Sequence, residues 1–178
     1  MTVVESTFEA RRPPDDDFDV VLAEISWHWL DPATRYQRAW RVLRPGGHLA
    51  IWSATHVMPD DGDRFFLDIQ DVYDEIGEGL DEQATWWRPG EVPDARAEIE
   101  ATGLFGDVVV RQFDWELGYD TEAYLRLLDT FSGHIAMEPW KRDRLYGEFS
   151  RRLAQRPDHR LRRHWGAVLH VTRRIDQT

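Results

Sequence analysis

The chain contains no cysteine, so it can form neither disulfide bonds nor thiolate metal ligands. It also has no run of 18 apolar residues and no apolar segment typical of a signal peptide, so we expect no membrane segment and a cytoplasmic location. The chain has no excess of positive charge either, because its formal net charge is -11. Nucleic acid and anionic membranes are therefore not expected as partners.

What is present indicates a globular protein. Hydrophobic residues make up 42% of the 178 residues and include nine tryptophans, so we expect one domain over residues 1–178 with a substantial core. No metal is predicted, because the histidines lack the paired spacing of a metal site. The acidic runs 15–17 and 60–63 are expected to be solvated loops, and the arginines of 151–163 a solvated helix face and loop.

Residues 18–54 have the pattern of a βαβ unit. Val20–Ala23 is a continuous apolar run, which predicts a buried strand of a parallel sheet with helices on both faces. Asp31 and Pro32 suit the N-cap and first turn of a helix that ends at the Pro-Gly-Gly of 45–47. A second parallel strand is expected at Leu49–Ser53. The helix would bury Tyr36, Ala39, Trp40 and Leu43 and turn Arg35, Arg38 and Arg41 to solvent.

Apolar periodicity predicts further elements downstream. A strand over Asp107–Leu117, partly buried on both sides, is expected to pair with a closing strand over Ala167–Thr172. The helices are expected at Asp63–Ile76, Asp94–Ala101, Asp120–Phe131 and Trp140–Leu153, each with its apolar stripe facing inward.

Three segments in order carry a family resemblance: Phe18-Asp19-Val20-Val21, His28-Trp29-Leu30 and the run 41–47 that ends in Pro-Gly-Gly. The segment 127–134 continues the match. The chain resembles the class I S-adenosylmethionine-dependent methyltransferases, in particular the type 11, trans-aconitate methyltransferase-like branch that acts on small molecules. The resemblance implies an α/β fold: an incomplete Rossmann-like sheet of strands three to seven, helices on both faces and a helical substrate cover. Residues 1–178 would be the C-terminal part of that fold.

The family's glycine-rich turn after strand one and its acidic residue after strand two have no counterpart here. The only Gly-x-Gly, at 77–79, follows an acidic helix and is expected to be a helix end and loop. Thr2–Ser6 resembles the family's third strand. Without strands one and two, either Thr2–Ser6 pairs directly with Val20–Ala23, or Val20–Ala23 is an exposed apolar edge that pairs with a second copy or a partner chain.

The resemblance implies S-adenosylmethionine as cofactor and places four residues beside it. Phe8 and Glu9 would lie next to the adenine, and Glu24 and Ile25 at the carboxyl end of the adjoining strand. The family usually has a small or amide residue where Glu24 stands. A carboxylate there would accept a hydrogen bond or make a poorer site.

The resemblance also suggests residues for chemistry and substrate binding. His28 would orient or deprotonate an acceptor hydroxyl, with Trp29 beside the substrate; alternatively, Trp29 packs on the following helix and His28 is a partly exposed turn residue. Thr130, Ser132 and His134 would line the acceptor pocket. For Ser132, a hydroxyl bonded to its own backbone at a helix end is the alternative.

Two functions follow. The first is S-adenosylmethionine-dependent methyl transfer to a carboxyl or hydroxyl group of a small molecule, with the natural start of the protein upstream of Met1. The second is a non-catalytic methyltransferase-like binding or partner subunit. A nicotinamide-dependent oxidoreductase is disfavoured, because the Gly-x-Gly-x-x-Gly turn is missing.

Overall fold

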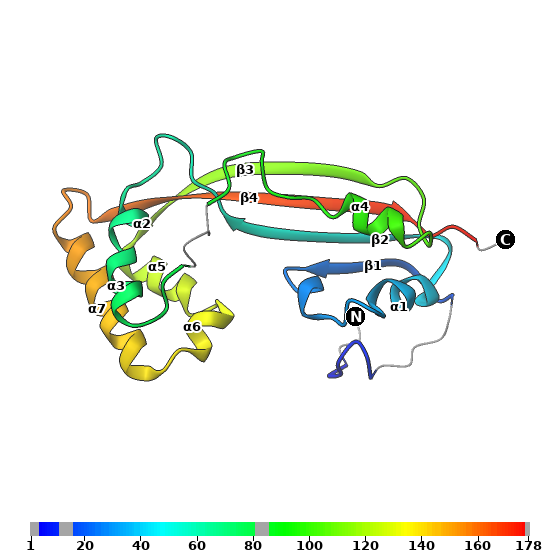
Figure 1. Cartoon of the computed structure of the whole chain (residues 1–178), viewed down its shortest axis with the longest axis horizontal. Helices are drawn as coiled ribbons and strands as arrows, with labels where there is room; N and C mark the ends of the chain where they lie inside the picture. Colours follow the sequence, from blue (N-terminus) through cyan, green and yellow to red (C-terminus); the bar gives the residue numbers. More distant parts are fainter. Residues whose placement is uncertain (1–3, 11–15, 81–85, 177–178) are drawn as a thin grey trace. The chain divides into compact units, whose positions relative to one another are not determined.

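The computed structural model describes residues 4–10, 16–80 and 86–176. The chain divides into two compact units. Unit 1 comprises the described residues within 1–55, 90–113 and 166–178, and unit 2 those within 56–89 and 114–165. A four-stranded sheet has the order β1-β2-β4-β3 (Figure 1). Its strands are β1 Phe18–Glu24, β2 Leu43–His56, β3 Val109–Asp120 and β4 Arg160–Arg173. The predicted α/β class and the predicted pairing of the last two strands are confirmed.

The predicted βαβ unit is present in unit 1. Strand β1 runs parallel to β2, and the 3-10 helix η1, Trp27–Trp29, and helix α1, Arg35–Val42, connect them. The predicted N-cap at Asp31 is wrong, because the helix begins at Arg35 with Thr34 as its N-cap. The Asp31 carboxylate instead accepts hydrogen bonds from the Ala33 N–H at 2.9 Å and the Thr34 hydroxyl at 3.0 Å, so it organises the turn that precedes the helix.

Strand β2 begins six residues earlier than predicted. The backbone becomes extended at Leu43, directly after the helix. The register to β1 then shifts between the pairs Phe18↔Leu43 and Val20↔His48, so the Pro-Gly-Gly segment is taken up as an irregularity at the start of the strand. Gly46 has a φ of +73°, which favours glycine, and a Cβ there would meet the Arg173 guanidinium at 2.5 Å.

The core of unit 1 forms between α1, β1, β2 and helix α4, Arg96–Ala101. Three of the four predicted α1 positions are buried in it, while Trp40 is half-buried. Arg35 corrects the prediction that it points to solvent. It is largely buried, because its guanidinium pairs with Glu98 at 2.5 Å and donates to the Trp27 carbonyl at 2.9 Å. The buried core residues are Ala23, Trp27, Tyr36, Ala39, Leu43, Leu49, Ile51, Ile99, Leu104, Phe105 and Val108.

Strand β1 is not the buried strand that its apolar run predicts. It stands at the end of the strand order with one neighbouring strand. Val20 and Leu22 lie on the same face of the strand and are 45% and 64% exposed, whereas Val21 and Ala23 on the opposite face pack into the core of unit 1. Of the predicted third strand, residues 2 and 3 lie outside the described residues, and 4–6 are not in a strand. The direct pairing of this segment with β1 is therefore not found in the described residues, and the alternative of an exposed apolar edge agrees with the structure.

Unit 2 gathers the other helices (Figure 1). They are α2 Phe65–Asp68, α3 Gln70–Glu75, α5 Thr121–Leu128, α6 Ser132–Ala136 and α7 Pro139–Ala154. The single helix predicted over 63–76 is broken at Ile69, which ends α2 and begins α3, but its predicted apolar stripe is buried. The buried core consists of Phe65, Phe66, Ile69, Val72, Ile76, Tyr124, Leu128, Leu145, Phe149, Leu153 and Leu161.

Two charged positions in unit 2 contradict the sequence predictions. Asp63, expected in a solvated loop, is 8% exposed, and Arg163, expected on a solvated surface, is also 8% exposed. The reason for Arg163 is that 160–163 belong to β4, where Leu161 and Arg163 fall on the buried face. Strand β3 is exposed rather than partly buried, since it stands at the other end of the strand order. Its Trp115 nevertheless stacks on Trp165, with ring centroids 6.2 Å apart.

Among the described residues, no helix is long and apolar enough to cross a membrane.

Candidate functional site

Unit 1 contains a cavity of about 290 Å³ at the carboxyl ends of the parallel strands β1 and β2. Ligands of open α/β sheets bind at this end of the strands. The lining comes from four segments of the chain: Ile25, Trp27, His28, Arg35, Ile51, Trp52, Ser53, Pro93, Asp94, Ala95, Glu98 and His170.

The turn that follows β1 and lines this cavity contains a strained residue. Ile25 has a φ of 45°, a conformation that a β-branched residue rarely adopts. Its N–H donates to the Trp52 carbonyl at 2.9 Å, which extends the β1–β2 pairing by one residue and holds the strained turn. Such strain costs about 1–3 kcal/mol and concentrates at functional sites, so it marks this turn as a candidate site.

The cavity of unit 1 combines aromatic, acidic and neutral polar groups. The Arg35 guanidinium lies 5.7 Å from the Trp27 ring centroid and pairs with Glu98, so its charge is compensated. His170 accepts a hydrogen bond from the Ala95 N–H at 2.8 Å, and burial lowers the pKa of its imidazole. His170 is thus neutral near pH 7 and acts there as an acceptor.

The structure brings only part of the predicted cofactor and catalytic residues to this cavity. Ile25 and His28 line it. Phe8 instead packs on Trp27 with ring centroids 6.5 Å apart, and Glu9 accepts a hydrogen bond from the Asp31 N–H at 3.4 Å. Glu24 and Trp29 do not line the cavity either. Glu24 is exposed at the end of β1, and Trp29 is 68% exposed with its ring against that of His28.

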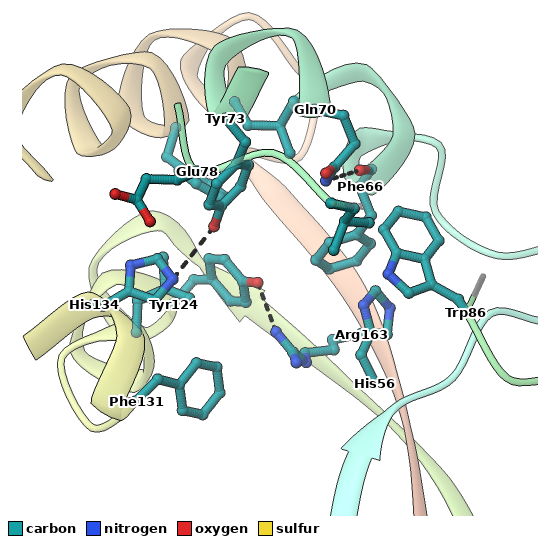
Figure 2. A pocket seen from close by; sticks show the side chains of 14 residues that line it. His56, Phe66, Gln70, Tyr73, Glu78, Trp86, Tyr124, Phe131, His134 and Arg163 are labelled. Atoms are coloured by element: carbon teal, nitrogen blue, oxygen red, sulfur yellow. Dashed lines mark hydrogen bonds between the residues drawn. The ribbon is translucent and has the colours of Figure 1, made fainter. Parts of the chain in front are cut away.

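Unit 2 contains a second cavity of about 230 Å³ (Figure 2). Most of its wall is aromatic or apolar, with His56, Arg163, His134, Glu78 and Gln70 as its polar members. The full lining is His56, Phe66, Ile69, Gln70, Tyr73, Glu78, Leu80, Trp86, Tyr124, Leu128, Phe131, His134, Phe149 and Arg163.

Arg163 is the central cation of this second cavity. Its Nη1 donates to the Tyr124 hydroxyl at 2.8 Å, and its guanidinium lies 4.3 Å from the Trp165 ring centroid and 5.3 Å from that of Phe131. Its buried Nε has no hydrogen-bond partner, and among the described residues no carboxylate lies within ion-pair distance. Cation–π contacts contribute about 0.5–2 kcal/mol each, whereas burying a charge costs several kcal/mol. Four rings contact this guanidinium and together offset much of that cost, but they leave its buried Nε–H without a hydrogen-bond acceptor among the described residues.

The groups around Arg163 are held neutral. Burial and the nearby guanidinium lower the pKa of His56 to about 3 and also lower the pKa of His134. Burial raises the pKa of the phenols of Tyr73 and Tyr124. Glu78 is charged but pairs with Lys141 at 2.7 Å. Among the described residues, the wall of this cavity therefore carries one charge without an ion-pair partner, and it is positive.

The three predicted substrate residues have different surroundings in unit 2. His134 lines the cavity, with its Nε2 3.3 Å from the Tyr73 hydroxyl oxygen. Thr130 is exposed and donates to the Leu127 carbonyl at 2.7 Å, a helix-end hydrogen bond, while Ser132 is exposed at the start of α6. Neither Thr130 nor Ser132 lines the cavity.

The sequence interpretation missed His56 and Arg163 as residues of this cavity. The spacing of Leu161, Arg163 and Trp165 has the period of two typical of a strand, so it could have indicated that Arg163 shares a face with Leu161.

The neutral histidines make stability depend on pH. The His56 pKa of about 3 in the folded chain lies below the value of about 6.5 expected when unfolded, so below pH 6.5 only the unfolded chain takes up this proton. We expect His56 to lower the free energy of unfolding by about 2 kcal/mol between pH 7 and pH 5, with His134 and His170 acting in the same direction.

Urea unfolding across this pH range checks the expectation. The variant His56→Gln should show a flatter pH dependence than the parent chain, whereas His48→Gln, at an exposed position, should keep the parental slope. Equal slopes for His56→Gln and the parent would contradict this expectation.

Among the described residues, no group of three or more His, Cys, Asp or Glu could hold a metal ion.

Comparison with known proteins points to one family. A family model described as a methyltransferase domain matches residues 1–51. Over 40 residues, the chain is 48% identical to an uncharacterised methyltransferase of Mycobacterium bovis and equally to one of Mycobacterium tuberculosis. This match spans 22% of the chain and only 16% of the length of either relative.

A solved structure agrees in fold. The chain superposes with a TM-score of 0.51 and 21% identity on a structure described as a type II methyltransferase from Anaeromyxobacter dehalogenans, covering 93% of this chain and 68% of that one. The sequence match includes the βα part of unit 1 and reaches into β2, and the superposition covers most of the sheet and helices. Residues 1–51 therefore match the methyltransferase domain family in sequence, and the chain shares the fold of a solved methyltransferase.

Proposed function

We propose that the chain takes part in S-adenosylmethionine-dependent methylation of a small-molecule acceptor. The observation that carries the proposal is the cavity of unit 1. It lies at the carboxyl ends of two parallel strands, next to a strained turn, and much of its wall belongs to the segment that matches the methyltransferase domain. Open α/β sheets bind nucleotide-like cofactors at this edge.

The residues of this cavity fit such a cofactor in chemical type. Asp94 and the hydroxyl of Ser53 could accept hydrogen bonds from ribose hydroxyls or an amino group, and aromatic Trp27 and His28 could contact adenine or the sulfonium. When bound, S-adenosylmethionine supplies an electrophilic methyl group. Methyl transfer depends mainly on holding the two reactants in line, so a shaped aromatic cavity with few acid and base groups suits it.

In this proposal His28 is the group that handles the acceptor proton. It lines the cavity and lies against Trp29, so its imidazole could accept a proton from an acceptor hydroxyl. An acceptor carboxylate would need no base, and His28 would then only orient it. Glu24, Phe8 and Glu9 remain proposed cofactor contacts, with Trp29 as a proposed substrate contact.

Isothermal titration with S-adenosylhomocysteine tests the proposal directly. We expect the chain to bind it with a Kd in the range of about 1–100 μM and Ser53→Leu, which fills part of the cavity, to weaken binding at least about tenfold. His48→Leu is the matched control, since it adds the same side chain at an exposed position of β2 outside the cavity. Absence of binding by the parent chain would contradict the proposal.

A second candidate function is that of a non-catalytic binding or partner subunit. The exposed edge of β1, with Val20 and Leu22 uncovered among the described residues, favours it, because such an edge is a template for pairing with another strand. Light scattering on the titrated sample separates the two functions. A dimer that does not bind S-adenosylhomocysteine supports the partner subunit, and binding supports the methyltransferase.

A further inference from the structure

The cavity of unit 2 has the chemistry of an anion site. Arg163 is more than nine-tenths buried, and its Nε faces no hydrogen-bond partner. A guanidinium has five N–H donors, and the hydrogen bond to the Tyr124 hydroxyl satisfies one of them. A carboxylate is the natural complement of the remaining donors, since it can accept two parallel hydrogen bonds from one guanidinium.

The other polar groups of the cavity favour an anion and disfavour a cation. Figure 2 shows Arg163 between His56 and Tyr124, with His134 and Phe131 also facing the cavity. His56 Nε2 and His134 Nδ1 are buried and have no hydrogen-bond partner, so each could donate to or accept from a ligand. The carboxylate of Glu78 is held by Lys141. A bound anion would thus find one cation and two free imidazole nitrogens.

The rest of the wall indicates the shape and polarity of the part of the ligand that carries the carboxylate. Phe66, Trp86 and Phe131 line the cavity, and the His56 ring stands against Phe66 and Trp86 with centroids 4.3 Å and 5.3 Å apart. Flat rings at these positions favour a planar or short apolar group. The volume of about 230 Å³ lies below the range of about 300–1,000 Å³ typical of drug-sized ligands, so the ligand is small.

We infer that the cavity of unit 2 binds a small monocarboxylate with a flat apolar body, its carboxylate on Arg163 and its body among Phe66, Trp86 and Phe131. The binding itself is independent of methyl transfer.

Titration with benzoate tests the inference, with benzamide as its uncharged analogue of nearly the same shape. We expect the parent chain to bind benzoate at least about tenfold more tightly than benzamide, as followed by tryptophan fluorescence and isothermal titration. Equal affinity for the two probes, or no binding of benzoate, would overturn the inference. This comparison uses only the parent chain, so it stands even if a variant fails to fold.

Variants locate the site. Arg163→Met keeps much of the length of the side chain and removes its charge, and it should weaken benzoate binding at least about tenfold. Arg160→Met, on the same strand, removes an exposed guanidinium bonded to the Gly118 carbonyl and should leave benzoate binding unchanged. Parental affinity in a folded Arg163→Met chain would overturn the inference. Neither probe involves S-adenosylhomocysteine, so failure here is distinguishable from failure of the proposed function.

Discussion

Asp63→Ala is expected to lower the free energy of unfolding by about 3 kcal/mol, although a sequence pattern would place this residue in a solvated loop. The carboxylate accepts hydrogen bonds from the Phe65 N–H at 3.0 Å, the Arg162 N–H at 2.9 Å and Arg156 Nη1 at 3.0 Å. Burial alone would raise its pKa, but these three donors hold that pKa below its usual value. Removing the carboxylate leaves two buried or half-buried backbone donors and one guanidinium without an acceptor.

Urea unfolding of the variant, followed by far-UV circular dichroism, measures this loss. Asp61→Ala is the matched control, because it removes an exposed carboxylate two residues away and should change stability by no more than about 0.5 kcal/mol. A loss in Asp63→Ala no larger than in this control would show that the three hydrogen bonds do not stabilise the folded chain.

Phe149→Ala is expected to cost about 3–5 kcal/mol, the range for removing a fully buried aromatic ring. Phe149 is 1% exposed on α7, and its ring lies 5.2 Å from that of Phe65, 5.4 Å from Tyr124 and 6.5 Å from Tyr73. It therefore joins three other helices of unit 2. The cavity left behind could not close without moving all three neighbours, which is why the cost should lie well above that of a surface change.

The same unfolding experiment provides the control for this variant. Leu67→Ala shortens a side chain on α2 that is 51% exposed, and it should cost well under 1 kcal/mol. Because Phe149 also lines the cavity of unit 2, the variant should bind benzoate more weakly as well. Similar unfolding midpoints for the two variants would contradict the central position of Phe149 in the core.

Local patterns in the sequence were sufficient to predict most of the helices and their buried faces, although the short helix α6 was not predicted. The turn at Asp31, the apolar stripe of α1 and the stripe from Phe65 to Ile76 depend on neighbours three or four residues away, which the sequence displays directly. The break at Ile69 was not visible, because it lies within a continuous apolar periodicity.

Burial of polar groups could not be predicted in this way. Asp63 is buried because Arg156 and Arg162, 93 and 99 residues further along the chain, supply its donors. Likewise, the exposure of Val20 and Leu22 depends on which face of β1 the rest of unit 1 covers and not on their own hydrophobicity.

The candidate sites were predictable only in part. Ile25, His28 and His134 line cavities. His28 and His134 stand in segments that resemble the family, and Ile25 follows the strand that carries another such segment. Arg163 and His56 were missed, because their importance arises from an aromatic enclosure assembled from several segments of unit 2. A cation in an alternating strand pattern gives no sign of whether an acidic partner will face it.

The stacked pair of Trp115 and Trp165 gives unit 2 a built-in optical reporter. Their rings are stacked, with centroids 6.2 Å apart and an interplanar angle of 11°, so their excited states should couple and change the circular dichroism of the indole bands. Trp165 also lies against the Arg163 guanidinium. A ligand that reorients this cation would thus alter the spectrum of the pair, and occupancy of the cavity could be followed without any label.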